Sequence, residues 1–421
     1  MKRLLFILLS FGPLLVSAQQ VLTLEECYTL AEKNYPLAKQ TVLLEEKTQS
    51  EIAILEKGKL PKLDFNAQAN YQSDVIEYPF EIPNSPVEPP NKDQYRATLD
   101  ANQLIYNGGN IAANTKLKTA ELAAQQQQVA VNLYTLKNRI NQNYFSVLLF
   151  QEQEKLLLSK MEVLDARLKE INTGVKYGAV LPASEQLLKA EQLKLEQQLS
   201  QINFDKQKAL KNLSLLVFQD LDSNTTLAKP SIFIAPEMES QRPELELFNL
   251  QETQLETSKE VISKSNYPKL LGFAQAGYGN PGLNMLDNSF QDFYIVGLKL
   301  NWNIFDWGKT KEQKQAVDIS KEIVSTEKET FVLNNEMQQK EAESDINKYE
   351  AMLRKDSEII ELREKVLQAT TSQLQNGAIT SSEYITELNN LYEARIDQQL
   401  HEVQLALAKA NYKVIKGNFN E

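Results

Sequence analysis

The sequence is short of the residues that most enzyme and metal chemistry requires. Among 421 residues there is one cysteine, Cys27, and one histidine, His401. A single cysteine excludes an internal disulfide and a cysteine-based metal cluster. With a single histidine, Ser-His catalysis could involve only His401. Zinc sites built from several histidines are excluded. The glycines form no phosphate-binding loop pattern. We therefore predict no enzyme activity, no cofactor and no metal site.

A surplus of positive charge is also missing. The formal net charge is −11 at pH 7, and no basic stripe with interleaved aromatic residues is present. A nucleic-acid partner is therefore not expected. Hydrophobic residues make up 42 % of the chain, which argues against a disordered protein.

A long apolar run occurs only at the N-terminus. Lys2 and Arg3 precede the apolar stretch Leu4–Val16, and Ser17 and Ala18 complete a small-residue cleavage pattern. This pattern predicts a secretory signal peptide over residues 1–18, with an uncleaved anchor as the alternative. Cys27 lies too far beyond the cleavage site to be a lipid acceptor, and its role stays open.

Glycine and proline are absent from two long stretches. Asn110–Thr173 has 64 residues without either, and Lys309–Asn376 has 68. A helix rises about 1.5 Å per residue, so each stretch predicts a rod of roughly 100 Å, too long for a compact globule. The stretches lead to Gly-Ala pairs at Gly178 and Gly377, which are 199 residues apart. Such an offset predicts two tandem repeats.

A similar box precedes each long stretch at the same 199-residue offset. The first box ends in Tyr-Asn-Gly-Gly and the second in Phe-Asp-Trp-Gly. We predict that the boxes turn a strand into a helix, and their candidate residues are Tyr106, Asn107, Gly109, Phe305, Asp306 and Gly308.

Alternating apolar and polar residues come before each box. They predict strands at about 61–76 and 94–106 in the first half, and at about 268–279 and 292–305 in the second. Residues 77–93 hold five of the 14 prolines and predict an exposed loop. One apolar and one polar face over about ten residues suits a transmembrane β-strand. A soluble antiparallel sheet has the same alternation, so both interpretations stay open.

The remaining segments are predicted to be helical. Leu188, Leu195, Ile202, Ala209 and Leu216 recur every seven residues, which is typical of a coiled-coil seam. The predicted order is a first repeat, a linker and a second repeat. The first repeat is 19–219, with a long helix at 109–173, a tip at 174–184 and a return helix at 185–217; the linker is 220–243; the second repeat is 244–421, with a long helix at 308–373, a tip at 374–383 and a return helix at 384–416.

Four strands per chain cannot close a barrel, and lipid does not tolerate an open sheet edge. Several chains are therefore needed, and three chains around one axis would supply twelve strands. The predicted fold class is mainly α with a transmembrane β part. The alternative is a secreted coiled-coil scaffold or adhesin stalk that carries a small soluble sheet and has no channel activity.

The duplicated strand–loop–strand order, the two boxes and the two Gly turns resemble the outer-membrane efflux proteins, the TolC-like outer membrane factors of Gram-negative bacteria. The resemblance covers essentially the whole mature chain. It implies a homotrimer with a 12-stranded barrel in outer-membrane lipid and a periplasmic α-barrel of long antiparallel coiled-coil helices. It also implies a passive exit duct of a tripartite efflux or type I secretion system. The duct would meet a periplasmic adaptor (membrane fusion protein) and an inner-membrane pump of the resistance-nodulation-division or ATP-binding-cassette type. The sequence specifies neither the substrate nor the pump class.

The resemblance also assigns roles at the tips. It implies that the two Gly turns contact the adaptor, although glycine also commonly just ends a helix. The residues concerned are Gly178, Ala179, Val180 and Leu181 in the first tip, and Gly377, Ala378, Ile379 and Thr380 in the second.

A narrowing of the closed pore is implied next to the second tip. The first of the family's two carboxylate positions falls on Glu383, and the second falls on Thr386, which departs from the pattern beside Glu387. The alternative for Glu383 is a charge that favours the start of a helix. Leu374 and Ile379 occupy the family's latch positions, so the closed state must be held differently in this chain.

Overall fold

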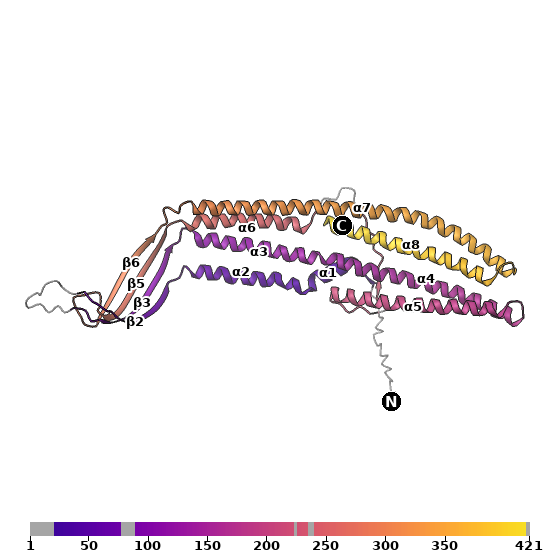
Figure 1. The fold of residues 1–421 in the computed structure, drawn as a ribbon, viewed down its shortest axis with the longest axis horizontal. Coiled ribbons are helices and arrows are strands. Elements are labelled where there is room, and N and C mark those ends of the chain that lie inside the picture. The colour runs from indigo at the N-terminus through magenta and orange to yellow at the C-terminus, as the bar shows by residue number, and fades with distance from the viewer. Residues whose placement is uncertain (1–20, 77–88, 223–224, 235–239, 418–421) are drawn as a thin grey trace, which may run out of the picture. The chain divides into compact units, whose positions relative to one another are not determined.

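The structure is a computed structural model that describes residues 21–76, 89–222, 225–234 and 240–417 (Figure 1). The predicted signal peptide and most of the predicted loop 77–93 lie outside these residues. The chain is mainly helical and divides into two compact units. Within the described part of the chain, every helix lacks the combination of length and apolar character that spanning a membrane requires. Unit 1 comprises residues 1–38, 132–242 and 333–421, and unit 2 comprises residues 39–131 and 243–332.

Unit 2 contains a four-stranded antiparallel sheet in the order β2-β3-β5-β6. Each repeat supplies one pair of strands, and β3 and β5 join the two pairs in the middle (Figure 1). The edges are therefore β2 and β6. The strands are β2 (Lys62–Tyr71), β3 (Asp93–Tyr106), β5 (Lys269–Asn280) and β6 (Gln291–Asn301), so β2 and β6 end earlier than the alternation predicted.

Polar contacts join the helices of unit 2. These helices are α2 (Gln40–Lys57), most of α3 (Asn110–Tyr134), α6 (Pro243–Ser265) and the first part of α7 (Lys309–Gln375). Lys118 on α3 lies 3.3 Å from Glu51 on α2. Lys259 on α6 lies 2.8 Å from Asp318 on α7. Ion pairs that are still partly open to water, as these are, contribute little stability each, about 0–1 kcal/mol.

Unit 1 has an apolar core around the first part of α4 (Leu136–Lys176). Tyr144 and Phe145 of α4 are fully buried there. The Tyr144 hydroxyl donates to the carbonyl oxygens of Leu22 and Ala228, at 3.0 and 2.6 Å. These bonds attach a small parallel ladder of β1 (Val21–Leu22) and β4 (Thr226–Leu227) to the helix. Residues 226–227 had been predicted as plain linker. The N-terminal elements of the unit are α1 (Leu24–Asn34) and the 3₁₀ turn η1 (Pro36–Lys39), whose last residue falls in unit 2.

Two helical hairpins complete unit 1. In the first, α4 turns back into α5 (Pro182–Val217), and in the second, α7 turns back into α8 (Ser381–Lys416). Both contribute to a second apolar cluster that includes Leu164, Leu195 and Leu388. The predicted seam of α5 lies inward: its leucines and Ala209 are buried and Ile202 is partly buried.

One predicted helix is interrupted. The stretch predicted as a continuous helix at 109–173 is divided at Thr135 into α3 and α4. The Thr135 hydroxyl donates to the carbonyl oxygen of Asn132 at 2.7 Å. Such a bond to the preceding turn competes with the backbone ladder and bends helices. The corresponding helix of the second repeat, α7, runs through 67 residues without a break.

Candidate functional site

The sheet presents its apolar residues on one face. Across the ladder Phe65 lies opposite Leu99, Leu99 opposite Ala276, and Ala276 opposite Tyr294. Side chains of one face meet in this way because residues alternate along each strand. Leu298 on this face is 69 % exposed and Tyr294 is 79 % exposed. A contiguous apolar surface of this kind marks an interface with another protein or with lipid.

The opposite face of the sheet carries a polar network. Asp100 accepts hydrogen bonds from the side chains of Asn66 at 2.7 Å, Thr98 at 2.9 Å and Gln275. These residues belong to β2, β3 and β5, so the network crosses three strands. A face of charges and amides is suited to contact with water.

Two phenylalanines on the polar face lie against glycines. A methyl group added to Gly277 would come within 2.4 Å of the Phe293 ring, and one added to Gly297 within 2.7 Å of the Phe273 ring. The alternation alone did not reveal these contacts. A glycine inside a strand, which often marks a close approach, was the signal that could have indicated them.

The second box is held by its aspartate. The Asp306 carboxylate accepts hydrogen bonds from the backbone N–H groups of Gly308 and Thr310, both at 3.0 Å. It also accepts from the side chains of Thr310 and Asn266, the latter at 2.7 Å. These donors, with the Thr310 hydroxyl first, hold the pKa of Asp306 well below its usual range. Phe305 and Gly308 flank this turn, and Gly308 has a φ of 83°.

The first box makes the same turn by different contacts. Gly108 and Gly109 have φ values of 68° and 78°. A methyl group on Gly108 would meet the Cβ atom of Tyr267 at 2.3 Å. One backbone bond is shared by the two boxes: the Asn107 carbonyl accepts from the N–H of Asn110 at 3.2 Å, and the Asp306 carbonyl accepts from the N–H of Lys309 at 3.1 Å. Tyr106 ends β3 and is half exposed.

Both helical tips end in the same glycine turn. Gly178 and Gly377 have φ values of 73° and 70°. The Ala179 N–H donates to the Gly174 carbonyl at 2.8 Å, and the Ala378 N–H donates to the Gln373 carbonyl at 2.8 Å. Together with the bonds from the two tip glycines, this is the Schellman pattern that closes a helix end. The interpretation that these glycines end helices is therefore supported, and it leaves a contact role open.

The exposed residues of the two tips differ. Tyr177 and Leu181 of the first tip are 77 % and 75 % exposed, and Gly178 and Ala179 are exposed between them. In the second tip Gly377, Ala378 and Thr380 are exposed. Val180 and Ile379 lie partly buried against the apolar cluster of unit 1. The first tip thus offers the more apolar surface.

The structure gives Glu383 a role at the start of α8. Its carboxylate accepts from the Thr380 N–H at 2.8 Å and from the Thr380 hydroxyl at 3.0 Å. The Glu383 N–H donates to the Thr380 hydroxyl at 3.3 Å, which completes a capping box. The bonds from Thr380 hold the pKa of Glu383 below its ordinary value. The carboxylate is exposed and stays ionised.

The two neighbours of Glu383 in the predicted ring lie differently. Thr386 is exposed, and its hydroxyl donates to the Ser382 carbonyl at 3.0 Å. Glu387 is partly buried and pairs with Arg363 on α7 at 3.2 Å. Its charge is therefore partly compensated within the chain, and Glu383 is the exposed one of the two carboxylates.

The residues at the latch positions belong to the interior of unit 1. Leu374 and Ile379 pack, partly buried, against the cluster that contains Tyr384 and Leu388. They hold the α7–α8 turn together by apolar contact. Polar contacts further along the same two helices join Arg395 to Glu364 at 2.7 Å and His401 to Asp356 at 2.7 Å.

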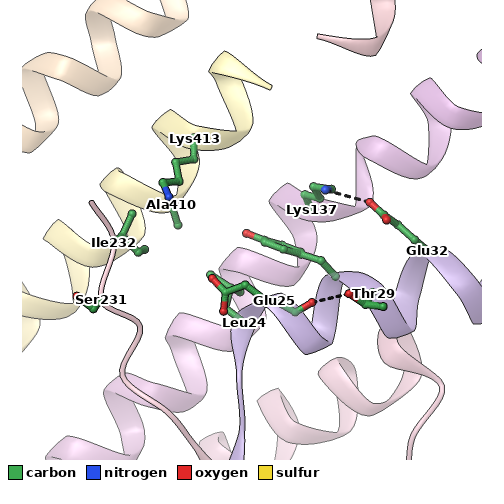
Figure 2. A pocket seen from close by; sticks show the side chains of 10 residues that line it. Leu24, Glu25, Thr29, Glu32, Lys137, Ser231, Ile232, Ala410 and Lys413 are labelled. Carbon is green, nitrogen blue, oxygen red and sulfur yellow. Dashed lines mark hydrogen bonds and ion pairs between the residues drawn. The ribbon is translucent and has the colours of Figure 1, made fainter. Parts of the chain in front are cut away.

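Unit 1 contains a cavity whose walls come from segments far apart in the sequence, so the sequence pattern does not predict it. It measures about 310 Å³ and lies between α1, α4, α8 and residues 231–232. Figure 2 shows Lys137 directed toward Glu32, and their charged atoms are 3.0 Å apart. Lys413 and Glu25 also line the cavity. The pairing compensates the buried ammonium of Lys137 within the chain.

Cys27 is a core residue. It is fully buried in the first apolar cluster. Burial, together with the nearby Glu26 and Glu25, raises the pKa of its thiol to about 12. The thiolate needed for chemical reaction is therefore scarce at neutral pH.

Comparison with known proteins shows the family to which the first repeat belongs. Residues 28–217 match the model of the outer membrane efflux protein family. These residues belong to the outer membrane efflux protein family. The resemblance inferred from the repeats is confirmed, and the efflux protein is located in the outer membrane of a Gram-negative bacterium.

Solved structures share the fold of this efflux protein at low sequence identity. VceC of Vibrio cholerae is 16 % identical, with a TM-score of 0.65 over 94 % of this chain and 97 % of its own. The CmeC channel of Campylobacter jejuni is 16 % identical, with a TM-score of 0.63 over 94 % and 85 %. The MtrE channel of Neisseria gonorrhoeae is 14 % identical, with a TM-score of 0.65 over 93 % and 88 %. No curated protein matches the chain.

The members of this family are channel proteins. The mainly helical fold of this chain matches the solved channel structures. The family match and the similar solved structures therefore support an outer-membrane efflux duct.

Proposed function

We propose that three copies of this chain form a passive exit duct through the outer membrane. The duct belongs to a tripartite efflux or type I secretion system. Each copy contributes four strands to a 12-stranded barrel and its helical hairpins to a periplasmic α-barrel. The energy for transport comes from an inner-membrane pump, because this chain shows no catalytic constellation in its sequence.

The exposed apolar face of the open four-stranded sheet carries this proposal. In one chain β2 and β6 have no outer neighbour among the described strands. A barrel that lies in lipid must leave no such edge, because unpaired backbone groups are costly there. Pairing β6 of one copy with β2 of the next satisfies both edges and turns every apolar face outward.

The two tips are proposed to contact a periplasmic adaptor. Gly178 and Gly377 form tight turns that present Ala179, Leu181 and Ala378 outward. The exposed rings and methyl groups of Tyr177 and Leu181 make the first tip the stronger apolar contact. Val180 and Ile379 are partly buried and support the turns from the inside, whereas Thr380 is exposed.

Glu383 is proposed to narrow the pore as a ring of three carboxylates. Thr386 and Glu387 lie on the following turn of α8, and Glu387 is held by Arg363. A ring of exposed carboxylates favours cations over anions. The pump class and the transported substrate remain outside this proposal.

Reconstitution into planar lipid bilayers tests the duct. Purified protein is expected to form ion-conducting pores and to run on gels as a heat-resistant trimer. A protein that stays soluble without detergent and conducts no ions would instead be the secreted scaffold or adhesin stalk.

Crosslinking tests the tips separately. Cysteines at Ala179 and Ala378, in a Cys27→Ala background, are expected to form adducts with the adaptor. Lys355→Cys on the exposed side of α7 is the matched control and is expected to form none. Absence of adducts at both tips would exclude them as the contact.

A further inference from the structure

The cavity of unit 1 is lined by charges of both signs. Two lysines and two glutamates line it, namely Lys137, Lys413, Glu25 and Glu32, so their formal charges cancel. Lys137 pairs with Glu32 at 3.0 Å. Within the described part of the chain, the side chains of Lys413 and Glu25 make neither a hydrogen bond nor an ion pair. One positive and one negative charge at the cavity are therefore left without a partner from these residues.

The Lys137 ammonium is already provided for. Lys137 is only 8 % exposed, and a buried charge is costly unless it is paired. Besides the Glu32 carboxylate, the Tyr28 ring lies near it, with 5.1 Å from the ammonium to the ring centroid. The Tyr28 hydroxyl donates to the side chain of Asn141. These contacts form the fixed part of the wall, and the charges open to a ligand are those of Lys413 and Glu25.

The two open charges come from different helices. Figure 2 shows Glu25 of α1 and Lys413 of α8 on opposite sides of the cavity. Glu25 is exposed and Lys413 is partly buried. Each charge also suits its helix end, because Glu25 lies in the first turn of α1 and Lys413 in the last turn of α8. That preference explains each charge by itself and leaves the space between them to be filled.

Apolar side chains complete the wall. Leu24 is buried, and Ile232 packs partly buried against the apolar core. Both line the cavity together with Ala410. The volume of about 310 Å³ is at the lower end of the range for small-molecule sites, about 300–1,000 Å³. The cavity therefore suits a small molecule with charged ends and an apolar body.

The charge balance selects one class of ligand. An anion bound to Lys413 would lie near the Glu25 carboxylate, and a cation bound to Glu25 would lie near the Lys413 ammonium. Like charges brought together in this way oppose binding. A molecule that carries both charges meets a partner for each and adds no net charge to the cavity.

We infer that this cavity binds a small zwitterion, a free amino acid or dipeptide, with its carboxylate on Lys413 and its ammonium on Glu25. The inference goes beyond the proposed duct and does not depend on it. Such a ligand would join α1 to α8, which belong to the first and last segments of unit 1. Binding is therefore expected to raise the melting temperature of the protein.

Titration calorimetry on the intact chain in detergent tests the site. The probes are L-alanine and L-alanyl-L-alanine. N-acetyl-L-alanine lacks the ammonium and L-alaninamide lacks the carboxylate, so each derivative removes one of the two charges. At least one zwitterion is expected to bind saturably, and the two derivatives to bind about tenfold or more weakly, because each loses one charge-assisted contact. Binding of neither zwitterion, or equal binding of alanine and its two derivatives, would overturn the inference.

Variants locate the site. Lys413→Gln and Glu25→Gln are each expected to weaken binding of the zwitterion by about tenfold or more. Lys33→Gln changes an exposed lysine of α1 that does not line the cavity, and it is expected to leave binding unchanged. Undiminished binding in both cavity variants would place the ligand elsewhere and overturn the inference. The ligand series on the unaltered chain decides the question even if a variant fails to fold.

Discussion

Among the residues that the structure describes, six glycines have positive φ, and their surroundings separate two kinds of turn. Gly178, Gly308 and Gly377 have open space where a side chain would begin, whereas Gly108 meets Tyr267. At these open positions only the positive φ disfavours a side chain. At Gly108 a side chain would be disfavoured both by the positive φ and by the contact with Tyr267, which lies just before β5.

Alanine substitutions therefore have graded effects. Gly178→Ala and Gly377→Ala are each expected to lower the free energy of unfolding by about 1–2 kcal/mol through backbone strain. Gly108→Ala is expected to cost clearly more, because its methyl group also clashes with Tyr267. Thermal unfolding of the three variants in detergent measures the difference. Equal effects would contradict the role assigned to Tyr267.

Asp306 should make the second box pH-dependent. Its pKa is lowered in the folded protein, so the stabilisation is fully present above the unfolded value near 3.8 and is lost as pH falls through the folded value. Asp306→Ala is expected to reduce thermal stability at pH 7, and Asn107→Ala in the first box to reduce it less. A melting temperature that falls equally in both variants would contradict the hydrogen-bond network at Asp306.

At the scale of elements, the start of α8 combines a cap with a charge. Thr380 and Glu383 bind each other reciprocally, which fixes the first turn of the helix below the second tip. Glutamine can replace glutamate in such a capping box. The two roles of Glu383 can therefore be separated by experiment.

Glu383→Gln is expected to keep the helix and lower the preference for cations, because it removes the ring charge and retains the cap. Thr380→Ala is the matched control that removes the cap and keeps the charge. The pKa of Glu383 is lowered from the ordinary glutamate value of 4.5, so the carboxylate stays mostly ionised at pH 4.5. The cation preference is therefore expected to persist at that pH. Single-channel recordings in a salt gradient measure both effects. Unchanged selectivity in Glu383→Gln would exclude the ring.

At the scale of the whole molecule, insertion depends on which face of the sheet is apolar. Leu298 and Ile295 are close neighbours on β6, but their side chains lie on opposite faces. A lysine on the lipid face near the membrane centre costs about 2–4 kcal/mol, whereas substitutions facing the lumen mainly change selectivity.

Leu298→Lys is therefore expected to reduce assembly into the outer membrane strongly, and Ile295→Lys to reduce it less. The measurement is the amount of heat-resistant trimer in outer-membrane fractions. Equal loss in both variants would contradict the assignment of the faces.

The sequence predicted much of this architecture, but it failed at particular places. The break at Thr135 was missed because a threonine is compatible with a regular helix. Whether it interrupts the helix depends on the hydrogen bond of its hydroxyl to a backbone carbonyl, which the sequence does not show. The cavity beside Lys137 was missed because its walls come from segments that are far apart in the sequence. Phe273 and Phe293 on the polar face were missed because their contacts with glycines run between strands.

By itself the sequence determined the repeat, the long helices, the glycine turns and the family. These features depend on local spacing and on residues whose backbone preferences are strong, namely glycine, proline and alternating apolar residues. Only the tertiary structure decided the surroundings of each side chain. It placed Glu383 in a cap, Glu387 beside Arg363, Leu374 in an apolar cluster and Trp307 in solvent. These outcomes depend on which distant segments meet, and the pattern along one chain does not contain that information.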